Sequence, residues 1–62
     1  MPMTSKEMIK YLERNGFVKV RQKGSHIFFI NPHTGKRTTV PMHSTDLKKG
    51  TEKSILKQAG LI

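Results

Sequence analysis

The start of the chain has the periodicity of an amphipathic helix. Its apolar residues fall within about a third of the helix circumference, and they are Met8, Ile9 and Leu12. Its basic residues lie on the opposite face, and they are Lys6, Lys10 and Arg14. Thr4 precedes Glu7 by three residues, the spacing of a capping box. Asn15-Gly16 supplies a left-handed stop, after which Phe17 folds back onto the last turn. The pattern therefore predicts a first helix between Thr4 and Asn15.

Three segments with strand character follow. They are Phe17–Gln22, Ser25–Asn31 and Lys36–Val40. The first alternates, with Val18 and Val20 predicted on one face and Lys19 and Arg21 on the other. The second contains the apolar run 27–30, which is typical of a central strand covered on at least one face. Each pair of neighbouring segments is therefore expected to form a hairpin.

Turn residues separate these segments. Lys23-Gly24 predicts a tight hairpin, because glycine tolerates the positive φ of primed turns. The run 31–35 predicts a second turn, with Pro32 fixing one φ and Gly35 at the strained position. Pro41 is expected to end the third strand, because it lacks the N–H that a strand pairing needs. The strands are thus predicted to be antiparallel neighbours.

A second helix is predicted near the end of the chain. Thr51 is its expected N-cap after Gly50, and Gly60 its expected stop. Its apolar stripe comprises Ile55, Leu56 and Ala59, with Leu61 and Ile62 expected to fold under the stop. We therefore expect one αβββα domain over residues 1–62, an α+β fold. The arrangement that buries these apolar faces most simply is a three-stranded antiparallel sheet with both helices on one face.

Composition narrows the function classes. The 62 residues carry twelve Lys+Arg against four Asp+Glu, a net charge of +8. A chain of this size forms one domain at most and buries only ~60% of its unfolded surface. A multi-part enzyme with its own cofactor-binding domain is therefore excluded. Cysteine is absent from the sequence, so neither disulfides nor thiolate metal sites stabilise the core. No apolar run approaches the ~18 residues of a membrane span. We expect a cytoplasmic protein without cofactor or membrane partner, whose charge favours a polyanion.

The positive charge is concentrated between Arg14 and Asp46, where no acidic residue occurs. This stretch holds Lys19, Arg21, Lys23, Lys36 and Arg37, and all three histidines. A surface without a partner usually mixes signs, so the strands and their turns are the expected polyanion surface. A second cluster, Lys48-Lys49, precedes the second helix, where basic side chains beside free helix amides suit a phosphate.

Histidine is the side chain here that can move protons near neutral pH. Lys23-Gly24-Ser25-His26 places His26 at a hairpin bend with positive neighbours, whereas His33 lies in a polar turn and His43 follows the last strand. RNA carries its own nucleophile, so a small ribonuclease needs little more than such a histidine. The alternative is a half-buried structural histidine, since His26 shares strand parity with Phe28. The spacing of the histidines fits no metal set, and we expect no metal site.

Several motifs together resemble one family. They are Arg21-Gln22-Lys23-Gly24-Ser25-His26, Val40-Pro41-Met42-His43, and Gly50-Thr51 followed by residues 55–61. In this order and length they are similar to the HicA toxins, small bacterial mRNA interferases of type II toxin–antitoxin modules. One departure is Ile27, at a position where we expect a second polar or histidine residue in many members of the family. It leaves the second proton-transfer group open.

The resemblance implies a double-stranded-RNA-binding-domain-like fold and a metal-independent endoribonuclease acting on mRNA, with His26 as its catalytic residue. It also implies a HicB-type antitoxin that covers the basic face around His26. We expect His26 to transfer one proton while Arg21, Lys23 and the Gly24 and Ser25 amides hold the phosphate. Further RNA contacts are expected from Lys36, Arg37, Lys48 and Lys49. The chief alternative is a non-catalytic double-stranded-RNA-binding module, which would need the same basic residues but not His26.

Overall fold

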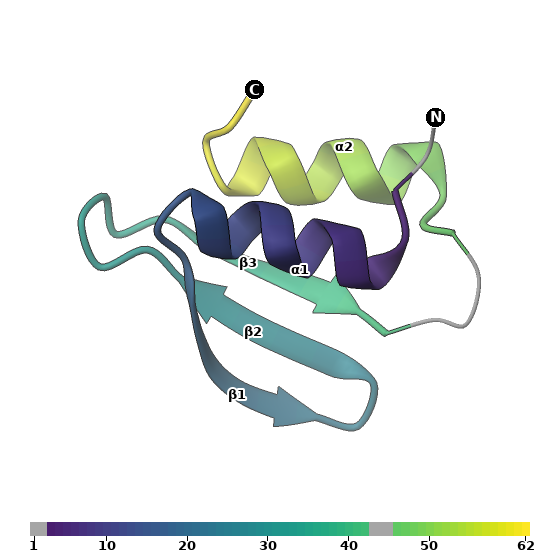
Figure 1. Cartoon of the computed structure of the whole chain (residues 1–62), viewed down its shortest axis with the longest axis horizontal. Helices are drawn as coiled ribbons and strands as arrows, with labels where there is room; N and C mark the ends of the chain where they lie inside the picture. The colour runs from purple at the N-terminus through teal and green to yellow at the C-terminus, as the bar shows by residue number, and fades with distance from the viewer. Residues whose placement is uncertain (1–2, 43–45) are drawn as a thin grey trace.

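The computed structural model describes residues 3–42 and 46–62, and its element order is αβββα. The elements are α1 (Ser5–Arg14), β1 (Val18–Lys23), β2 (His26–Ile30), β3 (Arg37–Pro41) and α2 (Lys49–Gln58). The three strands form one antiparallel sheet in the order β1-β2-β3. Both helices lie on one side of this sheet, leaving its other face uncovered by helices (Figure 1). The predicted order and sheet are therefore confirmed, with strand ends shifted by about one residue.

Local sequence sets both ends of α1. The Thr4 hydroxyl accepts from the Glu7 amide at 3.1 Å, and the Glu7 carboxylate accepts from the Thr4 amide at 2.9 Å, which completes the capping box. At the other end Gly16 adopts a φ of 89°. The Phe17 amide then donates to the Leu12 carbonyl at 3.0 Å, which closes a Schellman motif. The predicted first helix is confirmed.

Removing this cap tests its contribution to the fold. We expect Thr4→Ala to lower the free energy of unfolding by about 1 kcal/mol, because the Glu7 amide loses its acceptor. Urea unfolding followed by far-ultraviolet circular dichroism measures the change. Lys6→Ala in the same turn is the control, since Lys6 is exposed. Equal stability of the two variants would contradict a capping role for Thr4.

Strand register decides which side chains enter the core. Two cross-strand rows turn toward the helices: Gln22, Ile27 and Val40 in one, and Lys19, Phe29 and Thr38 in the other. The members from β2 and β3 are buried, while the members from β1 stay exposed. The core comprises Met8, Leu12, Phe17, Ile27, Phe29, Val40, Leu47, Ile55 and Ala59. It therefore lies between the helices and the β2–β3 part of the sheet.

The predicted alternation of β1 is wrong, because the strand contains a β-bulge. Lys19 pairs with Phe29, but Arg21 instead of Val20 pairs with Phe28. The extra residue moves Arg21 to the uncovered face, where a regular strand would have placed it opposite Ile27. Val18 and Val20 are 51% and 59% exposed, so the expected burial of their face is also wrong. The physical reason is that Val18 pairs with Ile30 on the uncovered face, while Val20 is the extra residue of the bulge in an edge strand.

The second helix begins earlier than predicted. Its N-cap is Lys48, which makes no side-chain capping bond, so the assignment of Thr51 as N-cap is wrong. The predicted stop is confirmed: Gly60 adopts a φ of 72°, and the Leu61 amide donates to the Leu56 carbonyl at 2.9 Å. Leu61 packs against the core, whereas Ile62 is 66% exposed and does not fold under the helix as expected.

Among the described residues, neither helix is long and apolar enough to cross a membrane.

Candidate functional site: the uncovered face of the sheet

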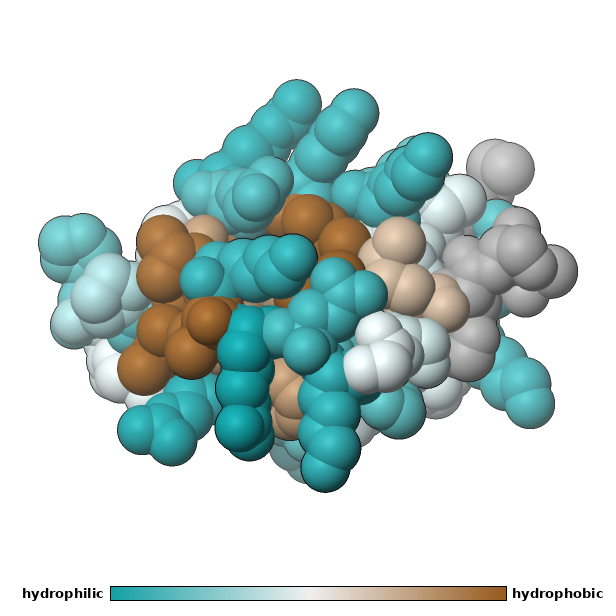
Figure 2. Space-filling model, turned by 90° about the horizontal axis from the view of Figure 1, so that it is seen from below, coloured by the Kyte–Doolittle hydropathy of each residue, from teal (hydrophilic) through white to brown (hydrophobic). Residues whose placement is uncertain are grey.

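The face of the sheet opposite the helices is basic at its edges and apolar at its centre. Its side chains form three cross-strand rows: Lys23, His26 and Pro41; Arg21, Phe28 and Thr39; Val18, Ile30 and Arg37. We call these nine residues the open face. None of them is acidic. Seen from the side of β1, the surface shows an apolar patch between hydrophilic side chains (Figure 2).

His26 begins β2 in the first of these rows. Its side chain is exposed, which is not the half-buried structural position considered as the alternative. It pairs with Lys23 on one side and with Pro41 on the other. It also lines a pocket with Thr39 and with residues of α2, which are Gly50, Thr51, Ser54, Ile55 and Gln58. His26 is therefore accessible to a ligand that binds in a pocket formed by two strands and a helix.

The turn before His26 is a two-residue hairpin loop. Because Lys23 pairs with His26, the loop consists of Gly24 and Ser25 rather than the predicted Lys23-Gly24. Gly24 has a φ of 59° and stands first in the loop, as glycine does in type II′ turns. The Ser25 carbonyl accepts from the Met42 amide at 2.6 Å, which ties the loop to the end of β3. The loop therefore sets the position of His26 at the start of β2.

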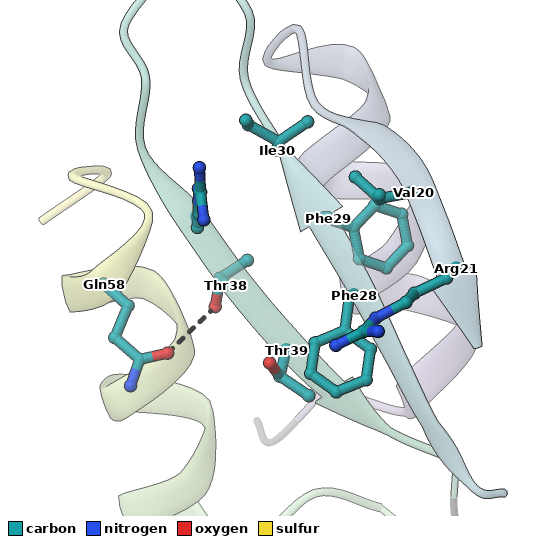
Figure 3. Close-up of a pocket in the computed structure, with 9 residues that line it drawn as sticks. Val20, Arg21, Phe28, Phe29, Ile30, Thr38, Thr39 and Gln58 are labelled. Carbon is teal, nitrogen blue, oxygen red and sulfur yellow. Dashed lines mark hydrogen bonds between the residues drawn. The ribbon is translucent and has the colours of Figure 1, made fainter. Parts of the chain in front are cut away.

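A second pocket occupies the middle of the open face (Figure 3). Arg21 crosses the ring of Phe28, with its guanidinium carbon 4.9 Å from the ring centroid, a cation–π distance. On the far side Gln58 of α2 lies beside β3, where its Oε1 accepts from the Thr38 hydroxyl at 3.3 Å. Thr39 and Gln58 line both pockets. The two pockets therefore adjoin at Thr39 and Gln58, and we call them together the groove.

The structure places the predicted basic residues at different distances from His26. Arg21 and Lys23 share the open face with it, and Arg37 lies in the third row beside Ile30. Lys48 and Lys49 are exposed at the start of α2, whose next residues line the His26 pocket. Lys36 lies at the other end of the sheet, where its side chain is packed beside Gly60. Lys36 is thus the one furthest from His26 along the strands.

The other histidines do not join His26 in the described part of the chain. His33 lies in the exposed turn between β2 and β3, at the opposite end of β2 from His26. Its amide donates to the side chain of Asn31 at 2.9 Å, so its backbone has a structural role. His43 lies outside the described residues. Within the described ranges, 3–42 and 46–62, no group of three His, Asp or Glu side chains could hold a metal ion.

Ile27, the residue at which the sequence departs from the family pattern, faces away from the site. It is 6% exposed and belongs to the core, because successive strand residues point to opposite faces. A polar residue there would enter the helix-facing core instead of the groove that contains His26. The departure therefore removes no group from the open face.

No local sequence pattern indicates that side chains of α2 line the groove beside His26. Thr51, Ser54 and Gln58 line the His26 pocket together with Thr39. All three follow Thr39 by more than ten positions in the chain. Their polar residue types are common on exposed helix faces, so nothing in their local pattern distinguishes them. Phe28 was predicted only as part of a covered strand. These positions become recognisable once the strand register and the packing of α2 are known.

The arrangement is suited to binding an anionic polymer and moving a proton. Positive side chains flank a groove that is apolar around Phe28, and the exposed imidazole of His26 lies at its more polar end. No curated protein sequence matches the chain. The family model of the HicA toxin of bacterial toxin–antitoxin modules matches residues 5–61, which include both helices and the whole sheet. The chain therefore belongs to the HicA toxin family, whose members function with an antitoxin partner.

Proposed function

We propose that this toxin is an endoribonuclease that cleaves mRNA without a metal ion and thereby stops translation and growth. The observation that carries the proposal is the position of His26, exposed on a basic face beside Lys23 and the first turn of α2. The whole chain, residues 1–62, acts as one domain. Its substrate is in the cytoplasm, and we propose the same location for the toxin.

RNA supplies its own nucleophile, the 2′-hydroxyl, so the protein must only hold the phosphate and assist proton transfer. His26 assists one of the two proton transfers. The 2′-oxygen forms a bond to the adjacent phosphorus while the bond from phosphorus to the 5′-oxygen breaks. The products are a 2′,3′-cyclic phosphate and a free 5′-hydroxyl. His26 either takes the proton from the 2′-hydroxyl or gives one to the 5′-oxygen, and water makes the other transfer. Such a mechanism is slow, because only one of the two transfers is assisted by a side chain.

The remaining predicted residues hold the substrate. Lys23 and Arg21 lie on the same face as His26, and with the Gly24 and Ser25 amides they hold the phosphate that reacts. Further along the RNA, the backbone contacts are proposed to come from Lys36, Arg37, Lys48 and Lys49. Lys48 and Lys49 add positive charge to the α2 N-terminus, where helix amides also favour an anion.

A HicB-type antitoxin covers the open face in this proposal. The net charge of +8 favours a partner with an acidic surface, because complementary charges steer association. A partner that occupies the groove excludes RNA and covers His26 at the same time. It also stabilises the small toxin by mass action, since it binds the folded form.

Purified toxin incubated with mRNA and excess EDTA tests the reaction class. We expect fragments that end in a 2′,3′-cyclic phosphate, and no cleavage where a 2′-deoxynucleotide replaces the nucleotide before the scissile phosphate. The deoxy substrate removes the nucleophile and leaves the binding surface intact. Fragment ends are read by mass spectrometry.

Two outcomes would contradict the proposal. Cleavage of the 2′-deoxy position would exclude the internal nucleophile. Binding of RNA without any cleavage, together with a preference for duplexes, would favour the double-stranded-RNA-binding module instead. Growth arrest on expression of the toxin, relieved by an acidic antitoxin, is the corresponding result in cells.

A further inference from the structure

Phe28 holds a position that the core does not explain. Its neighbours in β2, Ile27 and Phe29, are buried under the helices, whereas Phe28 points to the open face and is only half-buried. In the described part of the chain both helices lie on the opposite side of the sheet from this face (Figure 1). An aromatic ring in the middle of an uncovered sheet face provides a flat surface that a planar ligand can contact.

The β-bulge places a second flat group over this ring. In a regular strand Val20 would pair with Phe28, and Arg21 would point toward the helices. The bulge instead brings Arg21 opposite Phe28, where the guanidinium lies 4.9 Å from the ring centroid (Figure 3). Arginine planes and aromatic rings are the two kinds of side-chain surface on which unpaired nucleobases stack. The local irregularity of β1 therefore assembles a stacking surface.

Charges on both sides of this pair favour a nucleic acid over an apolar peptide. Lys23 lies in the row before it, next to His26, and Arg37 lies in the row after it. Phe28 is two residues from His26 on the same face of β2, a separation of about 7 Å. A ligand that placed a flat apolar group on the Arg21–Phe28 pair would bring flanking negative charges to these cations. One nucleotide next to a reacting phosphate meets this description.

We propose that Arg21 and Phe28 form a stacking subsite for one unpaired nucleobase adjacent to the phosphate at His26. The inference rests on the proposed ribonuclease function and makes its substrate more specific. A base within a duplex is paired and stacked on its neighbours, so it cannot reach this surface. The subsite therefore selects single-stranded RNA, although the chain has the element order expected of a duplex-binding fold.

Fluorescence anisotropy with a short labelled RNA tests the subsite in the full chain. Both toxins carry His26→Ala so that the RNA stays intact, and one of them also carries Phe28→Leu, which keeps an apolar side chain but removes the ring. We expect Phe28→Leu to weaken single-strand binding about tenfold, as loss of a stacked base does. Tyr11→Leu is the matched control, because Tyr11 is an exposed aromatic residue on α1.

An abasic RNA separates stacking from a general effect on the fold. Scanning an abasic nucleotide along the oligonucleotide should weaken binding to the parent toxin about tenfold at one position. At that position it should leave the Phe28→Leu toxin unaffected, because the two changes remove the same contact. Arg21→Lys is a second variant that keeps the charge and loses the plane, and it should give the same pattern. Circular dichroism verifies that each variant is folded.

The outcomes distinguish this inference from the function on which it rests. Equal loss on abasic RNA in the parent and Phe28→Leu toxins would overturn the subsite, as would duplex RNA binding as tightly as a single strand. A variant that binds RNA normally but no longer binds the antitoxin would assign Phe28 to the protein interface instead. If the wild-type toxin neither binds nor cleaves RNA, the proposed function itself fails.

Discussion

His26→Ala is expected to reduce RNA cleavage by roughly 10²- to 10⁴-fold, the usual contribution of one general acid or base. The remaining rate would come from the cations that hold the phosphate, which the substitution leaves in place. The side chain is exposed and begins β2, so its removal takes nothing from the core. Initial rates on a labelled RNA of fixed sequence measure the effect, and RNA affinity should change little.

His33→Ala is the matched control for this experiment. His33 is also exposed, but it lies in the turn at the other end of β2, and its structural contact to Asn31 uses the backbone amide. The His33→Ala toxin should cleave RNA at the same rate as the wild-type toxin. Added imidazole should restore part of the activity of the His26→Ala toxin, because it replaces the missing proton carrier. Undiminished cleavage by His26→Ala, with folding confirmed by circular dichroism, would contradict the assignment.

The sequence was most informative where one short segment determines the local structure. The capping box at Thr4 and the glycine stops at Gly16 and Gly60 depend on residues within one turn, and all three were predicted. The order αβββα followed from the same kind of local signal. The presence of His26 at a hairpin was likewise visible, because the turn and the histidine are adjacent in the chain.

Features that depend on pairing between distant residues were not accessible in this way. The bulge in β1 is visible only in its register with β2, and it places Arg21 on the opposite face of the sheet from Lys19, with which it was predicted to share a face. The prediction of Thr51 as N-cap is wrong because α2 begins two residues earlier, at Lys49, and its N-cap Lys48 makes no side-chain capping bond. The groove beside His26 needs Ser54 and Gln58 of α2 to lie next to β3, which no local pattern indicates.

The adjacent phenylalanines of β2 lead to the last prediction. Phe29 is 2% exposed and packs in the core, whereas Phe28 lies on the open face. We expect Phe29→Ala to lower the free energy of unfolding by about 3–5 kcal/mol, because it removes buried apolar surface and leaves a cavity. A single core in a chain of this length rarely supplies more than about 3–5 kcal/mol of stability. The variant should therefore be largely unfolded when alone, as read from urea or thermal unfolding.

Phe28→Ala, the same substitution one residue earlier, should cost much less stability, because that ring is already partly exposed to water. The two variants should thus separate fold from function, with Phe29→Ala losing the folded state and Phe28→Ala losing affinity for single-stranded RNA. Addition of the antitoxin should partly restore folded Phe29→Ala toxin, since a partner that binds the native form shifts the equilibrium toward it. Equal destabilisation by the two substitutions would contradict the division of β2 into a core face and a binding face.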